Sequence, residues 1–565
     1  MLSIRKIGVV GRTYRNLNRY RQILTILIKF GFGDLIDLLK IDQYIEIGLQ
    51  LISRDRRHPN EKLSRAERVR MAIEELGPTY VKLGQVLSTR PDLIPIEFTK
   101  ELSRLQDKVP PFPFEAVKTT IEEEFGKPLE DLFTFIDKTP FASASIGQVH
   151  RAQLEDDEMV AVKVQRPGIK KNIEIDLEIM LHMATLVERN IKEMALYRPV
   201  KIVEEFARTL EREIDYTIEA GSIERFSRHF LADPNVYIPN VYREKSTDRV
   251  LTMELVDGIK VSEIDKLETA GLDLKMITDR GADFYLKQVF ELGFFHADPH
   301  PGNIFILPEN IVCLIDFGMT GSVNLETRED FVDLIDGIIN RQESKVTQVL
   351  LKLTQWEEEP PIKQLERDVS DFMGQHLYRP LKEIEVGKLL NHLLELASRH
   401  FLIIAPDIFL MMKTLTMMEG VAMTLDPDFD MIAKAEPFIK RIKLARFHPG
   451  RIAEDMLQLG SQLMQFGRQF PKDILEITRL MRQQKLALKM EHKGFETMLA
   501  THDRISNRIS FSIIIAALII GSALIVISEI PPLFYGISLI GIILFSTAAI
   551  MGIWLLIAIL KKGRL

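Results

Sequence analysis

Cysteine is almost absent from this sequence, because Cys313 is the only one among 565 residues. A single cysteine excludes an intrachain disulfide framework and fits a reducing compartment. An excess of positive charge is also absent, since the formal net charge is −7 at pH 7. This balance argues against a general nucleic-acid-binding protein. The length requires more than one hydrophobic core, so we expect two or more domains.

Redox signatures are missing as well. We find no flavin-type Gly-x-Gly-x-x-Gly and no evident cluster of redox-metal ligands. Nothing in the sequence therefore supports direct oxidation chemistry.

Acidic residues are missing from the N-terminal stretch Arg5 to Lys29, which carries seven basic residues among apolar ones. Three interpretations remain open: a basic helix lying on an anionic membrane, a mitochondrial transit peptide, or a solvated helix face. Transit peptides are rich in serine, and Ser3 is the only serine before residue 50. We favour the membrane-surface helix.

Charged residues are absent from two stretches near the C-terminus, Ile509 to Ser528 and Leu533 to Leu560, of 20 and 28 residues. At ~1.5 Å per residue, even the shorter one spans about 30 Å, the thickness of a hydrocarbon core. Pro531 and Pro532 predict a tight turn between them. We expect a transmembrane hairpin whose two ends are cytoplasmic, because basic residues flank both ends. The alternative is a buried helical hairpin.

The stretch from Gly293 to Gly318 carries the chemistry. Asp298 is followed five residues later by Asn303, and Asp316 follows thirteen residues after that, directly before Phe-Gly. In phosphoryl transfer one carboxylate orients or deprotonates the acceptor, while an amide oxygen and a second carboxylate hold Mg²⁺. The pattern therefore predicts a nucleotide-dependent phosphotransfer site.

Upstream, two strand-like segments predict a β-hairpin that could cradle phosphates. Glycine is scarce in its turn: the positions of a kinase loop Gly-x-Gly-x-x-Gly-x-Val are occupied by Ala142, Ala144, Gly147 and Val149. Small residues in the turn, Ser145 included, would let backbone N–H groups approach a phosphate. A lysine on the returning strand, Lys163 in Val-Ala-Val-Lys, could neutralise it.

Lys163 needs an acidic partner, and the densest group of candidates is Glu211, Glu213, Asp215 and Glu219. The run Val250 to Glu254 then predicts a strand in the place of a kinase inter-lobe hinge. Main-chain groups from Glu254 to Val256 would face the adenine ring. A plain strand-to-turn connection is the alternative.

Two further helical segments complete the pattern. Gly77-Pro78 predicts a helix start, and Lys82 and Gln85 of the following Lys-Leu-Gly-Gln segment share one helix face, by default a solvated one. Residues 325–440 are expected to be mostly helical. Within them, the methionine-rich run 411–423 is interpreted as core packing.

Taken together, these residues resemble the UbiB/ADCK family of atypical, protein-kinase-like proteins linked to ubiquinone biosynthesis. The resemblance covers about residues 60 to 440, and the C-terminal hairpin is typical of bacterial members. It rests on Lys82-Leu-Gly84-Gln85, the alanine-rich loop 142–149, Val-Ala-Val-Lys163, Glu213-Ile-Asp215 with Glu219, His296-Ala-Asp298-Pro-His-Pro-Gly-Asn303 and Asp316-Phe-Gly.

The resemblance implies a role for each matched residue. Lys163 would pair with Glu219 and contact the α/β-phosphates, Asp298 would stand in the place of the catalytic base, and Asn303 and Asp316 would bind Mg²⁺. The Lys-Leu-Gly-Gln helix would form an inhibitory lid over the site. Its predicted regulatory residues are Lys82, Gln85, Glu213 and Asp215. Alanine in the nucleotide loop is a family trait thought to disfavour ordinary kinase behaviour.

The expected fold class is α+β, a protein-kinase-like two-lobed fold with a helical N-terminal extension, a helical C-terminal region and a C-terminal transmembrane hairpin. The expected domains are a basic segment with the extension (1–110), an N-lobe with inserted helices (111–258), a C-lobe (259–440), amphipathic helices (441–508) and two transmembrane helices (509–560). Inserted helices are required because 56 residues separate Lys163 from Glu219.

The function implied is a membrane-anchored atypical kinase or ATPase that uses ATP and Mg²⁺ and supports ubiquinone (isoprenoid quinone) biosynthesis. It would act on or extract lipid precursors, or regulate the biosynthetic enzymes. Alternatives are a nucleotide-binding scaffold without phosphoryl transfer and a protein kinase. Expected partners are membrane lipids, isoprenoid quinone precursors and quinone-biosynthesis enzymes, but no nucleic acid; a homodimer is a further option. The expected location is the inner (cytoplasmic) membrane of a bacterium, with the kinase-like domain cytoplasmic.

Overall fold

The computed structural model describes residues 17–38, 63–90, 93–105, 110–191, 194, 197–356, 360–376, 385–482, 495–528, 530–534 and 537–562. The chain forms two compact units, one ending at Ala453 and one beginning at Glu454. Strands and helices mix within the first unit, so the α+β class is confirmed.

An antiparallel five-stranded sheet forms the first lobe. It consists of β1 (Phe135–Ile136), β2 (Ala142–Ser143), β3 (Gly147–Gln153), β4 (Met159–Gln165) and β6 (Val250–Glu254). The hairpin of β3 and β4 places Val149 opposite Lys163, and β6 places Leu251 on the other side of Lys163. The β-hairpin expected around the loop is therefore present, with its first long strand beginning at Gly147.

The central strand β4 does not alternate between buried and exposed residues. Val160, Ala161 and Val162 are all buried. The reason is that both faces of the sheet are covered. Val160 and Val162 pack in a cluster with α7 (Phe114–Phe125), whereas Ala161 packs in the cluster that contains α11 (Tyr216–Phe230).

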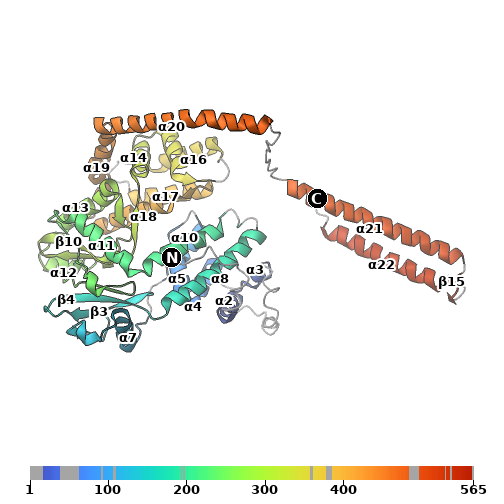
Figure 1. The fold of residues 1–565 in the computed structure, drawn as a ribbon, viewed down its shortest axis with the longest axis horizontal. Helices are drawn as coiled ribbons and strands as arrows, with labels where there is room; N and C mark the ends of the chain where they lie inside the picture. Colours follow the sequence, from blue (N-terminus) through green and yellow to red (C-terminus); the bar gives the residue numbers. More distant parts are fainter. Residues whose placement is uncertain are drawn as a thin grey trace. The chain divides into compact units, whose positions relative to one another are not determined.

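A helical layer lies beside this sheet (Figure 1) and shares one hydrophobic cluster. It combines α8 (Ile169–Asn190) and α10 (Pro199–Glu213), which fill the gap between Lys163 and Glu219, with the N-terminal extension. The extension contains α2 (Leu17–Lys29), α3 (Gly33–Leu38), α4 (Arg65–Leu76), α5 (Pro78–Ser88) and α6 (Ile96–Leu102). Ser64 and Glu67 form a capping box at the start of α4, and Pro78 opens α5 after Gly77, whose φ of 101° suits glycine.

The expectation that the basic N-terminal helix lies on a membrane is wrong for residues 17–29. Tyr20, Ile23 and Leu24 of α2 are buried inside the protein, so their apolar face is not available to lipid. Arg19 anchors the helix through its guanidinium group, which bonds Asp176 of α8 at 2.7 Å and the carbonyl of Leu76 at 2.7 Å. Residues 1–16 lie outside the described residues.

The second lobe contains a smaller sheet and most of the helices. The sheet runs β5 (Val236–Tyr237), β10 (Ile311–Leu314), β9 (Ile304–Leu307) and β7 (Ile259–Lys260), and a separate pair joins β8 (Phe294–His296) to β11 (Thr320–Ser322). The helices are α12 (Ile264–Thr269), α13 (Leu274–Leu286), α14 (Leu325–Ile339), α15 (Glu343–Leu353), α16 (Ile362–His376), α17 (Val386–Arg399), α18 (Pro406–Leu425) and α19 (Met431–Arg446).

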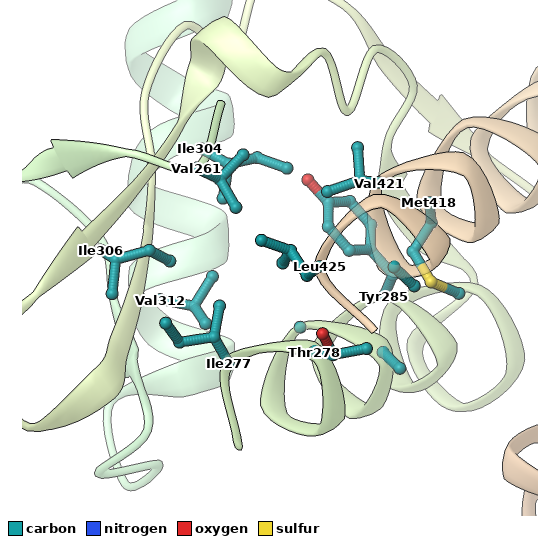
Figure 2. Close-up of a pocket in the computed structure, with 13 residues that line it drawn as sticks. Val261, Ile277, Thr278, Tyr285, Ile304, Ile306, Val312, Met418, Val421 and Leu425 are labelled. Atoms are coloured by element: carbon teal, nitrogen blue, oxygen red, sulfur yellow. The ribbon is translucent and has the colours of Figure 1, made fainter. Parts of the chain in front are cut away.

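A small apolar pocket lies in the core of this lobe, between α13, the sheet and the last turns of α18 (Figure 2). It encloses about 370 Å³, part of it open to solvent. The ring of Tyr285 enters the pocket from α13, and its buried hydroxyl makes no hydrogen bond within the described part of the chain.

The second unit is almost entirely helical. Helix α20 (Pro449–Arg482) leads into it from the first unit, and α21 (Phe495–Ile527) packs along α22 (Leu539–Lys562). The two helices approach closely at Gly541, where a Cβ atom would lie 2.5 Å from a methyl carbon of Val526. The second apolar stretch does not become helical at Leu533 as expected, because its start contains the short strands β14 (Leu533–Phe534) and β15 (Ile537–Ser538).

Two of the described helices are long and apolar enough to cross a membrane, Pro406–Leu425 and Ile505–Ile527. They differ in burial: 56% of the first is buried inside the protein, against 6% of the second. Helix α18 is therefore a core helix. The apolar part of α22, Leu539–Leu555, is shorter.

Candidate active site

The side chain of Lys163 is the centre of a three-residue ion cluster between the two lobes. Its Nζ lies 3.0 Å and 2.9 Å from the two carboxylate oxygens of Glu219, and 3.2 Å from Oδ1 of Asp316. Lys163 comes from β4, Glu219 from the first turn of α11, and Asp316 from the segment after β10. Of the candidate acidic partners, Glu219 is the one that pairs with Lys163.

Burial and charge act against each other in this cluster. Burial opposes the charged form of Lys163, but the carboxylates of Asp316 and Glu219 outweigh it and hold the pKa of Lys163 well above its usual value. Burial raises the pKa of Glu219 to about 7, although Lys163 acts in the opposite direction. The positive charge of Lys163 lowers the pKa of Asp316. At neutral pH Asp316 is therefore the firmly ionised carboxylate.

Residues 297–303 follow β8, and we name them the catalytic-loop segment after their expected role. His296, the last residue of β8, ties this segment to Asp316. The ring Nε2–H donates to the main-chain carbonyl of Asp316 at 2.7 Å, and Nδ1 accepts from the amide of Asp298 at 3.3 Å. These two bonds require the neutral tautomer with the proton on Nε2. Burial lowers the pKa of His296, which favours this neutral form.

The carboxylate of Asp298 is paired with a lysine from a distant helix. Oδ1 of Asp298 lies 3.0 Å from Nζ of Lys413 in α18. The next residue, Thr414, donates from its hydroxyl to the carbonyl of His296 at 3.2 Å. Helix α18 therefore contacts His296 and the catalytic-loop segment through two consecutive residues.

Asn303 and Asp316 lie at the same end of the β9–β10 hairpin. The register pairs Ile304 with Leu314, and the amide of Ile315 donates to the carbonyl of Asn303 at 3.0 Å. Asp316 follows immediately, with a φ of 62° that is uncommon for a residue other than glycine. Phe317 is buried beside Phe226 of α11, which holds this turn against the core.

The alanine-rich loop is a tight turn between β2 and β3. Ala142 pairs with Val149, and the amide of Ala144 donates to the carbonyl of Gly147 at 2.8 Å, with buried Ser145 between them. Glycine is required at position 147, since a Cβ atom would lie 2.6 Å from the carbonyl oxygen of Val164. The loop thus sits one strand away from Lys163.

At the expected hinge, Glu254 ends β6 and Val256 follows in the connection to the second lobe. Both carboxylate oxygens of Glu254 accept from the hydroxyl of Tyr237, at 2.6 Å and 2.8 Å. The side chain of Glu254 is therefore held by another residue of the protein. The amide of Leu255 donates to Met159 at 3.2 Å. Within the described residues, the amide and carbonyl of Val256 make no backbone hydrogen bond.

The Lys-Leu-Gly-Gln segment lies on α5, whose Lys82 forms an ion pair with Glu213 at the end of α10. Asp215 instead caps α11, accepting from the amide of Thr217 at 3.0 Å. Gln85 is half-buried on the same helix. Gly84 permits close packing, because a Cβ atom there would clash with a methyl carbon of Leu105.

Arg90, two residues after the end of α5, contacts the second lobe. Arg90 is 5% exposed, its Nη2 donates to the carbonyl of Ile404 at 3.2 Å, and its guanidinium carbon lies 5.0 Å from the ring centroid of Phe409. The extension therefore joins both lobes, through Glu213 on one side and Phe409 of α18 on the other.

Sequence reasoning missed Lys413 and Arg90. Lys413 lies in the methionine-rich run that was interpreted as core packing, and most of that run is indeed buried. The available signal was that Lys413 is the only basic residue in the apolar stretch 406–425. For Arg90 the sequence offered no comparable signal.

Family models match three parts of the chain: an ABC1 atypical kinase-like domain at residues 104–350, a UbiB helical domain at 369–430 and an ABC1/UbiB kinase-like C-terminal domain at 493–561. Among solved structures, the Rv3197–erythromycin complex from Mycobacterium tuberculosis is similar to the chain at 22% identity and a TM-score of 0.46. It covers 70% of this chain and 98% of that one.

Similar proteins extend over most of the chain. A "Probable protein kinase UbiB" from Aliivibrio salmonicida is 35% identical over 436 residues, covering 76% of this chain and 80% of that protein. An uncharacterized protein encoded in the hydrogenase 1 5′ region of Clostridium pasteurianum is 31% identical over 547 residues, covering 97% of this chain and 99% of that protein. The resemblance seen in the motifs is thus confirmed, and the chain belongs to the UbiB family of ABC1 atypical kinase-like proteins.

Proposed function

We propose that the protein is a membrane-anchored atypical kinase or ATPase that uses ATP and Mg²⁺. The observation that carries this proposal is the position of Lys163 between Glu219 and Asp316, 2.9 Å from one and 3.2 Å from the other. A lysine held by a buried glutamate and facing an exposed aspartate is the arrangement that positions nucleotide phosphates beside a metal-binding carboxylate. Asp298 and Asn303 supply the remaining groups.

The nucleotide would bind between the alanine-rich loop and the connection after β6. Ala142 and Ala144 are small and exposed, so phosphate oxygens would approach the loop there, whereas Gly147 is buried. Lys163 would contact the α/β-phosphates. Main-chain groups of Glu254 and Val256 would face the adenine. The amide and carbonyl of Val256 make no backbone hydrogen bond within the described part of the chain, which supports that assignment.

The donor set at the end of the β9–β10 hairpin fits Mg²⁺. Asn303 offers an amide oxygen and Asp316 a carboxylate that is 51% exposed and ionised, and hard cations prefer oxygen ligands of this kind. Few protein ligands are needed, since Mg²⁺ usually completes its shell with water and phosphate oxygens. When bound, the ion would neutralise charge on the phosphates.

In the transfer step the acceptor oxygen would attack the γ-phosphorus while the bond to the β–γ bridging oxygen breaks. ADP leaves with the electron pair of that bond, and the acceptor proton passes to Asp298. With water as acceptor the products are ADP and inorganic phosphate; with an alcohol they are ADP and a phosphate ester. The residues support both acceptors equally.

The extension would act as an inhibitory lid. Its α5 is held within the helix by the ion pair of Lys82 with Glu213, and just after the helix by the contact of Arg90 with Phe409. Glu213 lies six residues before Glu219 in the sequence, so the lid is attached close to the ion cluster. Release of these contacts would give a substrate access to Asp298.

The membrane and quinone parts of the proposal rest on other observations. Helix α21 is long and apolar enough to span a bilayer and is only 6% buried, and α22 packs along it. We assign these two helices as a membrane hairpin of a bacterial inner membrane. Membership of the UbiB family supports a role in isoprenoid quinone biosynthesis, with lipid precursors as substrates or cargo.

Phosphate release by purified protein in liposomes tests the proposal. Asp316→Asn and Asp298→Asn should each abolish turnover, whereas Asp279→Asn, a change at an exposed carboxylate of α13, should not. Turnover that rises with anionic lipid would support the membrane part. Tight Mg-nucleotide binding with equal background turnover in all four proteins would favour the nucleotide-binding scaffold, and an absence of nucleotide binding would refute both functions.

A further inference from the structure

Lys413 is a cation of the candidate site that comes from outside the kinase-like domain. Its Nζ lies 3.0 Å from Oδ1 of Asp298. The kinase-like family model ends at residue 350, whereas Lys413 lies in the segment matched by the UbiB helical domain. Two separate family segments therefore meet at one carboxylate.

The backbone of Lys413 is fixed by its neighbours. Met412 and Thr414 are buried, and the hydroxyl of Thr414 bonds the carbonyl of His296 at 3.2 Å. The side chain itself is 19% exposed, and that of Asp298 is 34% exposed. The ammonium group is thus held beside Asp298 while part of the pair still faces solvent, where an anionic ligand can reach it.

The charges of the site favour a cation beside the carboxylate of Asp298. Lys163 is already occupied by its bonds to Glu219 and Asp316, so it does not offset the negative charge of Asp298, which would face the place where the transferred group passes. A phosphoryl group that approaches Asp298 would be repelled by the carboxylate. A lysine at 3.0 Å from that carboxylate offsets the repulsion and can bond a phosphoryl oxygen at the same time, because an ammonium group has three donors.

We propose that Lys413 is a catalytic residue that binds the γ-phosphoryl group of ATP beside Asp298. This inference rests on the proposed nucleotide-dependent function and adds to it a ligand for the transferred group. The ligand class is a terminal phosphoryl group that ATP carries and ADP lacks. A purely structural ion pair between α18 and the catalytic loop would make no distinction between the two nucleotides.

The test compares Lys413→Met and Lys413→Arg with the full-length protein in liposomes. Lys413→Met should lower kcat roughly a hundredfold. It should also weaken binding of a non-hydrolysable ATP analogue about tenfold, while the affinity for ADP stays within about twofold. Lys413→Arg should recover a large part of both losses, since it restores the charge.

Lys434→Met is the matched control. Lys434 is also 19% exposed and also pairs with carboxylates, those of Asp279 and Asp283, but its ion pairs join α19 to α13. The Lys434→Met variant should keep wild-type kcat and nucleotide affinities. ADP binding by each variant also reports whether the site is folded.

Equal weakening of the analogue and ADP in Lys413→Met, or no change in either, would overturn the inference. The same loss in Lys434→Met would overturn it as well. If the wild type binds nucleotides but shows no turnover, the proposed transfer reaction fails by itself. The analogue-to-ADP comparison then still decides the role of Lys413.

Discussion

His296 donates a hydrogen bond of 2.7 Å to the main-chain carbonyl of Asp316. The same ring accepts from the amide of Asp298 at 3.3 Å, so one buried imidazole sets the spacing of the expected base and the expected metal ligand. Such a residue acts through others. Its loss should disturb the chemistry even though it touches neither nucleotide nor metal.

We expect His296→Ala to lower kcat by about 10- to 100-fold and to destabilise the fold by about 2–4 kcal/mol, because it leaves a cavity and two unpaired groups. His296→Gln should lose less. The control is His400→Ala, which also removes a buried imidazole ring. That ring bonds the side-chain carboxylate of Asp368 and lies outside the candidate site. Phosphate release and urea unfolding would be measured together; equal kinetic losses in His296→Ala and His400→Ala would contradict the prediction.

Turnover should fall as the pH drops through about 7. Only the ionised form of Glu219 pairs with Lys163, and its pKa is raised by burial to about 7, whereas Asp316 stays ionised because Lys163 lowers its pKa. In Glu219→Gln we expect this acid limb to disappear and turnover to be roughly 10- to 100-fold lower. A pH–rate profile of both proteins is the measurement. An unchanged acid limb in the variant would show that another group titrates.

The raised pKa of Glu219 also makes the stability of the protein depend on pH. The folded state keeps a proton on Glu219 that the unfolded state, with a pKa near 4.5, has already lost. The contribution of Glu219 to the free energy of unfolding should therefore decrease as the pH rises from about 4.5 to about 7. Urea unfolding of wild type and Glu219→Gln across this window would show whether the difference follows that sign.

Gly147→Ala should disrupt the alanine-rich loop. The added methyl group would meet the carbonyl oxygen of Val164 at 2.6 Å, a backbone atom that cannot rotate away. We expect a loss of about 1–3 kcal/mol and weaker ADP binding. The control is Gly221→Ala in α11, where the nearest atom lies at 3.7 Å; there helix propensity should stabilise the protein by up to about 1 kcal/mol. The measurements are the Tm and the ADP affinity of both variants and the wild type. A Tm for Gly147→Ala at or above that of the wild type would be evidence against the clash.

Arg90→Ala should raise phosphate release. The substitution removes the cation–π contact with Phe409 and the hydrogen bond to Ile404, together worth about 1–2 kcal/mol of lid closure, or about five- to thirtyfold in the open population. Arg70→Ala is the control, since Arg70 pairs with Glu74 and Glu101 inside the extension. Activity in Arg90→Ala that does not exceed that of Arg70→Ala would argue against a latch.

Tyr285→Phe should change the free energy of unfolding by less than about 1 kcal/mol, and in the stabilising direction. The reason is that the tyrosine hydroxyl is buried in the apolar pocket of Figure 2 without a hydrogen-bond partner among the described residues. Removing the hydroxyl loses no hydrogen bond in the folded protein, and it removes the cost of keeping an unsatisfied polar group away from water. Urea unfolding tests this. A clear destabilisation would mean that the hydroxyl has a partner such as a bound water.

Much of the candidate site could be proposed from the sequence because local patterns carry its residues. The strand before Asp316, the lysine on a returning strand and the asparagine five residues after Asp298 are fixed by short-range spacing. The choice of Glu219 among four neighbouring acids could not be made from such spacing alone. It depends on α11 starting at Tyr216 and packing under the sheet, which brings Glu219, and not Glu213, to Lys163.

The sequence by itself determined the family, the α+β class and the residues of the short motifs, because periodicity and spacing act within a few residues. Tertiary structure decided what the apolar faces pack against. It packed the apolar face of the basic N-terminal helix against the rest of the protein, where Arg19 meets Asp176 across 157 positions. It also brought Lys413 to Asp298 across 115 positions and Arg90 to Ile404 across 314. Contacts at such separations follow from the packing of whole helices, which no local pattern encodes.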